Sequence, residues 1–389
     1  MFLKSFSNAL SLWLSRFSAP VDIGSLIYFR IAFGAIMLWE MGRYFNHDWI
    51  RRYYIEPTFH FTYYGFGWVR PWPAVGMYLH FCGLTILAIC ILLGLWYRLS
   101  MALFCGGFTY IFLLDQTRYL NHFYLISLIS LLMIFAPAHR ALSIDVLRQP
   151  KLRADTASTW TLWSLRTQIG MVYFYAGVAK FNSDWLQGEP MRMWLAERTD
   201  LPLMGLLSTE TWMGCLLSYG GLLFDLLVIP CLLCRRTRLF AFAIAVGFHW
   251  MNSSLFSIGV FPWFMIAATT LFFQPNWPLP RALQGWTTNR APPKVFRTPL
   301  HFRHWIVIAL LSAYLVLQLL IPLRHFLYPG SVSWTEEGHR FAWRMKLRDK
   351  EADAKFIAID PLTQATQIID PLDQLTPMHF RFADFSPVM

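Results

Sequence analysis

Long apolar runs separated by short polar connections dominate the hydropathy pattern of this chain. A helix that crosses a bilayer needs roughly 20 mainly apolar residues. Runs that approach this length lie at 25–42, 74–96, 99–114, 122–138, 162–180, 214–234, 239–254, 258–273 and 304–322. They predict an all-α polytopic membrane protein with about nine transmembrane helices. For the two runs that meet between Asn252 and Gly259, the alternative is one broken or re-entrant element, which membranes tolerate where the backbone is buried in protein or lines a cavity.

The pattern changes after Pro329, where large apolar residues alternate with small or charged ones, as in a β-strand. The apolar positions of this alternation are Phe341, Trp343, Met345 and Leu347. A second short apolar stretch follows at 355–359, and the hexapeptide Ile-Asp-Pro-Leu-Thr-Gln at 359–364 is nearly repeated at 369–374. We therefore predict three regions: an amphipathic lead-in at 1–24, a transmembrane domain at 25–328, and a small β-rich appendage at 329–389.

Composition supports the bilayer as solvent. The chain is 56% hydrophobic and only 14% charged, whereas soluble domains carry about 25% charged residues. Its net charge of +11 does not require nucleic acid as a partner, because basic residues of membrane proteins gather in cytoplasmic connections.

The basic connections predict the orientation in the membrane. Arg98 and the segments 140–153, 235–238 and 281–303 fall on every second connection. This places the N-terminus in the cytoplasm and the C-terminus, with the β appendage, on the outer side. The first outer connection is an exception, because it contains Arg43, Arg51, Arg52 and Arg70. It is also aromatic, and we expect it to fold back as a cap at the membrane interface.

Charged groups within apolar runs are expensive and are therefore functional candidates. Asp225 lies in the middle of one run and needs a partner, for which Arg166 with Gln168, or Arg30, are the candidates. Lys180 ends another run. In one interpretation it is an interfacial lysine that reaches toward water and pairs with Asp184. In the other it is buried, partly neutral and able to act as a base, because burial disfavours the charged form of lysine.

Two further groups of polar residues are candidates. His249, Asn252 and Ser253 share one helical face, which Phe256 extends. Apolar walls with a few polar groups suit a quinone or another ring ligand, and hydrogen bonding between helices is the alternative. Asn121 and His122 begin the run at 122–138. For them the alternative is an interfacial helix start that Asp115 and Asn121 cap. We find no metal-binding motif.

Several long motifs occur together and in a fixed order. They are Phe112-Leu-Leu-Asp-Gln-Thr117 with Asn121-His-Phe-Tyr124, Arg166-Thr-Gln-Ile-Gly-Met-Val-Tyr-Phe-Tyr-Ala-Gly-Val-Ala-Lys180 with Asp184-Trp185, Gly220-Gly-Leu-Leu-Phe-Asp225, His249-Trp-Met-Asn-Ser-Ser-Leu-Phe-Ser-Ile-Gly259, and His325-Phe-Leu with Trp334 and Phe341-Ala-Trp343. Over roughly residues 20–345 the chain thereby resembles the vitamin K-dependent γ-glutamyl carboxylase family. It is most similar to a bacterial-type member with a horizontally transferred transmembrane (HTTM) domain.

The resemblance implies a reaction. In that family a lysine after Ala-Gly-Val deprotonates a reduced naphthoquinone, which reacts with O2 and yields a strong base. That base removes a γ-proton from a glutamyl side chain, CO2 adds to the carbanion, and the quinone leaves as its epoxide. The cofactor here would be reduced vitamin K or a menaquinol-like hydroquinone, with O2 and CO2 as co-substrates and no metal. The partners would be a glutamate-containing peptide or protein and membrane lipid, in a bacterial inner membrane.

The resemblance also implies residue roles. Lys180 takes the place of the catalytic base, and His122 that of a histidine beside the reacting centre. His249 and Asn252, with Ser253 and Phe256 on the same face, would bind the quinone. Arg198 and Asn121 would bind the substrate carboxylate.

The chain departs from the animal members in two respects: only a short region follows the last run, and one lysine stands where they have two. Two alternatives remain open, a quinol epoxidase without carboxylation and a non-catalytic quinone- or lipid-binding protein.

Overall fold

The computed structural model describes residues 17–198, 210–256, 258–273, 302–347, 355–373, 375–377 and 380. Helices account for most of these residues, and two small two-stranded sheets complete the fold. Each of the predicted apolar runs contains a helix. These long helices are α2 (Gly24–Asn46), α3 (Ala74–Leu93), α4 (Tyr97–Leu113), α5 (Asn121–Phe135), α7 (Thr159–Ala179), α10 (Thr211–Leu233), α11 (Arg238–Leu255), α12 (Phe261–Thr269) and α14 (Phe302–Leu320).

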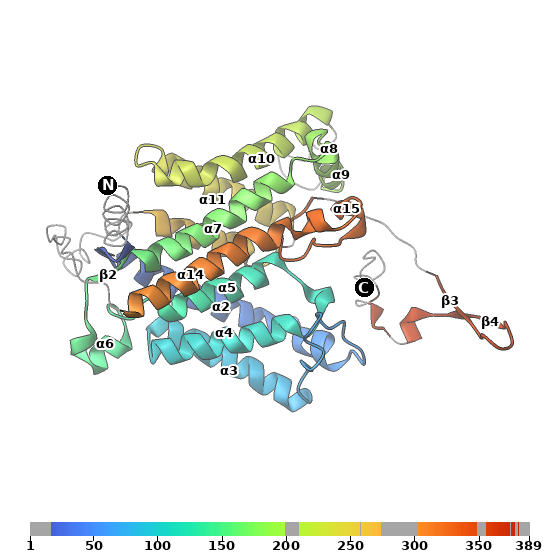
Figure 1. Cartoon of the computed structure of the whole chain (residues 1–389), viewed down its shortest axis with the longest axis horizontal. Coiled ribbons are helices and arrows are strands. Elements are labelled where there is room, and N and C mark those ends of the chain that lie inside the picture. Colours follow the sequence, from blue (N-terminus) through green and yellow to red (C-terminus); the bar gives the residue numbers. More distant parts are fainter. Residues whose placement is uncertain are drawn as a thin grey trace, which may run out of the picture.

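The long helices form a closed ring in chain order. Each helix packs on the next through the series α2, α3, α4, α5, α7, α10, α11 and α12, and α12 returns to pack on α2. α14 packs on α7 from outside the ring (Figure 1). The span Trp305–Leu327, which contains most of α14, is only 11% buried, against 61% for α2, and this difference agrees with the peripheral place of α14.

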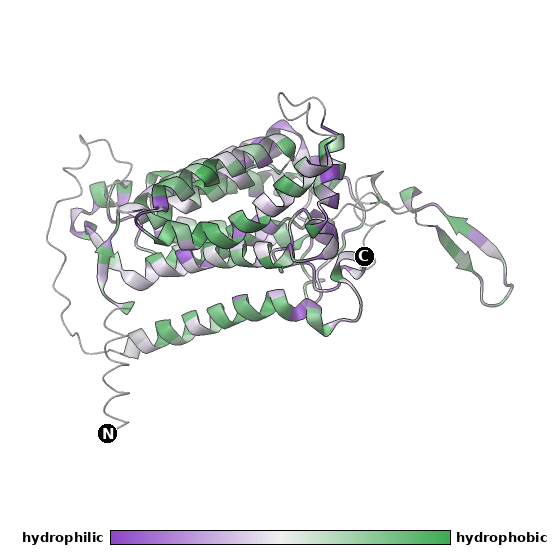
Figure 2. Cartoon of the chain, turned by 90° about the horizontal axis from the view of Figure 1, so that it is seen from above, coloured by the Kyte–Doolittle hydropathy of each residue, from purple (hydrophilic) through white to green (hydrophobic). Residues whose placement is uncertain are grey.

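Four helices of the described chain are long and apolar enough to cross a membrane: Gly24–Asn46, Ala74–Leu93, Thr211–Leu233 and Trp305–Leu327. α4, α5 and the stretch Phe261–Phe272 are apolar but shorter. In Figure 2 the long helices are coloured mainly as hydrophobic, and hydrophilic residues gather toward their ends. The chain is therefore a helical membrane protein. That all nine helices cross the bilayer, and that the C-terminus lies outside, remain predictions.

α11 and α12 are separate helices packed on each other, an arrangement that both two spans and one re-entrant element allow. The chain reverses between them at Gly259, whose φ of 61° is in the left-handed region that favours glycine. A Cβ at this position would also lie 2.6 Å from Nη1 of Arg43 on α2. The backbone conformation therefore favours glycine at the turn, and the missing Cβ leaves room for the Arg43 side chain.

The first connection, between α2 and α3, folds back on the bundle, as its aromatic composition predicts. Tyr53 and Tyr54 are buried in a short π-helical turn (Arg51–Ile55), and Tyr63 is buried further along. The backbone N–H of Gln116 donates to the Phe61 carbonyl at 2.7 Å and joins this connection to the one after α4.

Two short antiparallel sheets flank the helices. Strands β1 (Pro20–Asp22) and β2 (Thr156–Ser158) pair at the starts of α2 and α7, a pairing that the sequence did not predict. Strands β3 (Phe356–Ile359) and β4 (Thr366–Ile369) pair as an antiparallel hairpin, within the region predicted to be β-rich. The repeated hexapeptide makes the same turn after each strand, since Asp360 and Asp370 accept hydrogen bonds from the backbone N–H groups of Leu362 and Leu372.

The strand predicted at 341–347 is wrong, because this segment is irregular. Phe341, Trp343 and Lys346 all have positive φ, which a strand does not allow. The alternation arises from insertion into the bundle: Trp343 is fully buried and stacks on Tyr124 of α5 at 5.0 Å. The short helices α8 (Ser183–Leu186), α9 (Glu189–Ala196) and α15 (Val332–Thr335) lie at the same end of the bundle, opposite α6 (Ile144–Arg148) (Figure 1).

We predict that Gly34→Ala weakens the fold through the contact between α2 and α3. A Cβ on Gly34 would lie 2.6 Å from the backbone nitrogen of Leu92, which cannot move without separating the two helices. We expect a loss of about 1–3 kcal/mol of unfolding free energy, measured by thermal unfolding in detergent. Gly42 on the same helix has no atom within 4 Å of such a Cβ, so Gly42→Ala is the control. An equal melting temperature for the two variants would contradict the prediction.

Candidate functional site

A buried ion pair joins α7 and α10. Lys180, the residue that follows α7, places its Nζ 2.5 Å from Oδ2 of Asp225 in α10. The side chains are only 8% and 7% exposed. Lys180 Nζ also donates to the Ala176 carbonyl at 3.3 Å and lies 5.1 Å from the ring centre of Trp185. The amine is therefore inside the protein, and it does not reach toward water.

The motif around Lys180 produces this geometry locally. A Cβ at Gly177 would lie 2.7 Å from Leu226 Cδ2, so glycine there allows α10 to approach α7 closely. After Lys180 the chain turns, because Asn182 Oδ1 accepts the backbone N–H of Trp185 and caps α8. The Trp185 indole then donates to the Ser218 carbonyl at 2.9 Å, which holds its ring over the amine and against α10.

The sequence analysis assigned other partners to both Lys180 and Asp225. Asp184 accepts a hydrogen bond from Ser183, and Lys180 pairs with Asp225 instead. The proposed partners of Asp225 are occupied by other groups, because Arg166 donates to the Leu271 carbonyl and Arg30 to the Leu142 carbonyl. The sequence could not distinguish these candidates, since any cation on a neighbouring helix could have neutralised the buried Asp225 carboxylate.

A second buried pair lies one helix further around the ring. His249 of α11 is 2% exposed, and its Nε2 lies 2.7 Å from the hydroxyl of Tyr173 on α7. Its Nδ1 is buried and has no hydrogen-bond partner among the described residues. Sequence reasoning missed Tyr173. A signal was present, because Tyr173 lies seven residues before Lys180 and two helical turns place both on one side of α7.

Aromatic rings connect the two pairs and His122. Phe224, next to Asp225, contacts Tyr173 at 5.7 Å and stacks on Phe248 at 3.9 Å between ring centres. Phe261, at the start of α12, contacts both histidines, His249 at 6.2 Å and His122 at 5.8 Å. α5, α7, α10, α11 and α12 thus bring Lys180, His249 and His122 to one aromatic cluster within the ring of helices.

The other residues of the predicted quinone face lie further along α11. Asn252, Ser253 and Phe256 are half-buried, in the last turns of the helix and just beyond it. Phe256 packs edge-to-face on Trp194 of α9 at 5.2 Å. The ammonium of Lys346 lies 5.3 Å from the ring centre of Phe256 and 5.7 Å from that of Trp194. The predicted face therefore extends from the buried His249 to the end of the bundle.

The two residues predicted to bind the substrate carboxylate make structural contacts. Arg198 Nη1 donates to the carbonyls of Ser254 and Leu255, at 2.9 Å each, and caps the end of α11. The Asn121 amide donates to the Arg344 carbonyl at 3.2 Å and accepts from the Tyr119 hydroxyl at 3.0 Å. Asn121 does not cap α5, because the N-cap is Leu120. Asp115 does not cap α5 either; it caps the preceding turn Gln116–Arg118, through the backbone N–H of Thr117.

A further ion pair lies near this end of the ring and was not singled out as a site. Glu40 on α2 is 2% exposed, and its Oε2 lies 2.6 Å from Nη1 of Arg43. The same guanidinium borders Gly259, at the turn that leads to Phe261. This pair fixes the position of the α11–α12 turn relative to α2.

The donor set fits a reduced aromatic ring. Three phenylalanine rings surround a buried imidazole with one unengaged nitrogen, and a buried amine lies close by. Apolar walls with a few convergent polar groups are typical of sites for ring ligands. His249 would hold a ring oxygen, and Lys180 would face an ionisable hydroxyl. The described residues contain no group of three or more His, Cys, Asp or Glu able to hold a metal ion.

Comparison with known families assigns the chain. Residues 18–277 match the family described as HTTM domain, and this segment contains the whole ring of helices. Residues 303–389 match the family described as the lumenal domain of vitamin K-dependent gamma-carboxylase. The chain therefore belongs to the HTTM-domain membrane proteins. With both matches in one chain, it is a member of the vitamin K-dependent gamma-carboxylase family, and a carboxylase-like enzyme. No solved structure matches the chain.

The buried pair generates a stability prediction. Asp225→Leu leaves the Lys180 ammonium buried and unpaired, so we expect a loss of about 3–5 kcal/mol of unfolding free energy. The double variant Lys180→Met with Asp225→Leu removes both charges and should recover most of that loss. Thermal unfolding in detergent measures the cycle, with Asp184→Asn as the control. Equal stabilities for Asp225→Leu and Asp184→Asn would contradict the pairing.

Proposed function

We propose that the protein is an integral membrane, quinol-dependent γ-glutamyl carboxylase. The observation that supports this most is the buried Lys180–Asp225 pair, which lies beside an aromatic cluster with an unengaged imidazole nitrogen. The family membership supports the same function. Reduced vitamin K or a menaquinol-like hydroquinone would enter from the lipid, and a glutamyl side chain from the end of the bundle that carries α8 and α9.

The lysine can act as a base because of its partner. A Lys180 ammonium can transfer a proton across 2.5 Å to Asp225, which gives a neutral amine and a carboxylic acid. The pair has no net charge before or after this transfer, so the low dielectric of the interior does not oppose it strongly. With its amine neutral, Lys180 would be able to take a proton from a bound quinol hydroxyl, and the positive charge that the pair gained would lie beside the quinol oxygen.

The histidine pair orients the ring. When the Tyr173 hydroxyl donates to Nε2 of His249, the imidazole proton lies on Nδ1 and can donate to a quinone oxygen. His122, on the opposite side of Phe261, orients or protonates the reacting groups. When bound, the reduced quinone supplies, through its reaction with O2, a base strong enough to remove a glutamyl γ-proton, after which CO2 adds to the carbanion.

Residues 341–347 cover this end of the bundle and help to exclude water. Leu347 packs in one apolar cluster with Ala179 and Trp185, beside Lys180, while Trp343 stacks on α5, the helix that carries His122. The segment therefore extends from the His122 side to the Lys180 side. Exclusion of water protects a strong base from quenching.

Lys180→Ala tests the base directly. We expect it to abolish both epoxide formation and incorporation of labelled bicarbonate into a glutamyl peptide, because no other amine adjoins Asp225 in the described structure. A small external amine should restore part of the activity. Lys151→Ala removes an exposed lysine between α6 and α7 and is the control. Full epoxide formation in the Lys180 variant would contradict its role.

The same assay separates the alternatives. Epoxide formation without carboxylation, in the presence of a glutamyl peptide, would indicate a quinol epoxidase. Absence of quinol turnover in the wild-type protein, under conditions where it binds quinone, would indicate a non-catalytic quinone- or lipid-binding protein.

Tyr173→Phe should affect quinol binding more than chemistry. The variant loses one hydrogen bond to His249, a contribution of about 0.5–1.5 kcal/mol, and the imidazole loses its fixed orientation. We expect KM for the quinol to rise by roughly twofold to tenfold, with a smaller change in kcat. Tyr175→Phe on the same helix is the control, because that hydroxyl donates to the Leu319 carbonyl on α14, outside the ring. An unchanged KM in Tyr173→Phe would exclude this role of the pair.

A further inference from the structure

A cavity of about 350 Å³ lies far from the candidate site, where β1 and β2 pair. Arg98 at the start of α4 and Arg140 after α5 line it together with a set of hydroxyl groups. The hydroxyl residues are Ser18, Thr156, Ser158 and Thr161. Trp160 and Phe135 add an apolar wall.

The charge in this cavity is not balanced. No aspartate or glutamate lines it, and the described residues contain no ion pair of Arg98 or Arg140. The carboxylate of the neighbouring Asp145 is used elsewhere, because it accepts the backbone N–H groups of Trp96 and Tyr97. Two guanidinium groups and several hydroxyls are the partners that proteins provide for phosphate.

His139 shows the effect of this positive charge. Burial, and then the nearby charges of Arg98 and Arg140, lower the pKa of His139 to about 4. Its imidazole is therefore neutral at physiological pH and adds no charge of its own. The two arginines remain the charged groups of the cavity.

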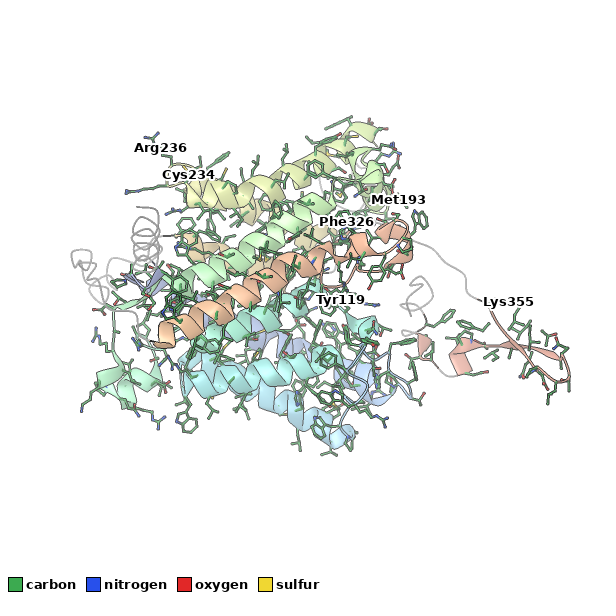
Figure 3. The ribbon with its side chains drawn as sticks, viewed as in Figure 1. Tyr119, Met193, Cys234, Arg236, Phe326 and Lys355 are labelled. Carbon is green, nitrogen blue, oxygen red and sulfur yellow. The ribbon has the colours of Figure 1, made fainter. Side chains whose placement is uncertain are left out.

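The cavity and Lys180 lie at opposite ends of α7. α7 alone connects the two places: it begins at Thr159, beside the cavity, and ends next to Lys180. At 1.5 Å per residue the distance along the helix is about 30 Å, close to the roughly 30 Å of a bilayer hydrocarbon core. Cys234 and Arg236, after α10, lie at the cavity end in Figure 3, and Met193 of α9 lies at the other.

We propose that this cavity binds the phosphate of an anionic lipid head group, with Arg98 and Arg140 as its charge partners. The phosphate chemistry could also come from free inorganic phosphate. The lipid source is favoured because the cavity lies one bilayer thickness from Lys180 and has Phe135 and Trp160 as an apolar wall for the upper part of the acyl chains. Basic pockets between helices on the cytoplasmic side are suited to such head groups.

The test compares lipids on the full-length protein. Thermal stability is measured in nanodiscs of phosphatidylcholine with increasing phosphatidylglycerol, and separately with inorganic phosphate added in detergent. We expect stabilisation by phosphatidylglycerol and none by millimolar phosphate. The double variant Arg98→Gln with Arg140→Gln should need at least about tenfold more anionic lipid for the same effect. The exposed pair Arg235→Gln with Arg236→Gln, at the same end of the bundle, is the control.

Ser158→Asp provides a second variant that preserves the fold. Ser158 is the N-cap of α7, a position that aspartate suits equally well, but the new carboxylate would neutralise part of the cavity. It should reduce the response to anionic lipid as the arginine variant does. A response in both variants equal to that of the control would overturn the site. Stabilisation by inorganic phosphate that depends on Arg98 and Arg140 would overturn the lipid source and identify a soluble phosphate ligand.

Discussion

The Lys180–Asp225 ion pair is the interaction on which the site depends. It joins the end of α7 to the middle of α10, where neither charge could remain alone in a membrane interior. Gly177 permits the close approach of the two helices, and the cap at Asn182 directs Trp185 over the amine. The local motif and the long-range partner are thus parts of one arrangement. The neighbouring Tyr173–His249 pair likewise joins two helices through buried polar side chains, but with neutral groups.

Much of the fold follows from hydropathy alone, since a run of apolar residues near bilayer length has few alternatives to a helix. The hairpin after residue 355 also follows from its pattern. The prediction failed at 341–347, where large residues alternate because they insert into a preformed bundle and not because they form a strand. Periodicity reports which side chains are buried, and it does not report what buries them.

The candidate site was predictable only in part. The buried lysine and the two histidines were identified from motifs, and the structure gathers them around Phe224, Phe248 and Phe261. The partner of Asp225 was not predictable, because 45 residues separate it from Lys180 and helix neighbours are a property of the ring. Arg198 and Asn121 were chosen for side-chain chemistry suited to a carboxylate. In the structure Arg198 donates to a carbonyl at the end of α11, and Asn121 donates to the Arg344 carbonyl in the irregular segment 341–347.

Closure of the ring by α12 on α2 has a consequence for biogenesis. These two helices are separated by more than 200 residues, and in the folded chain each intervening helix packs on its predecessor. The surface of α2 that packs on α12 therefore lacks this neighbour until synthesis has passed residue 269. Contacts between distant segments form late, so closure of the ring should be a single late docking step, which α14 and residues 341–347 then follow. Before α12 has been synthesised, this surface of α2 would be exposed to lipid or to an insertion chaperone.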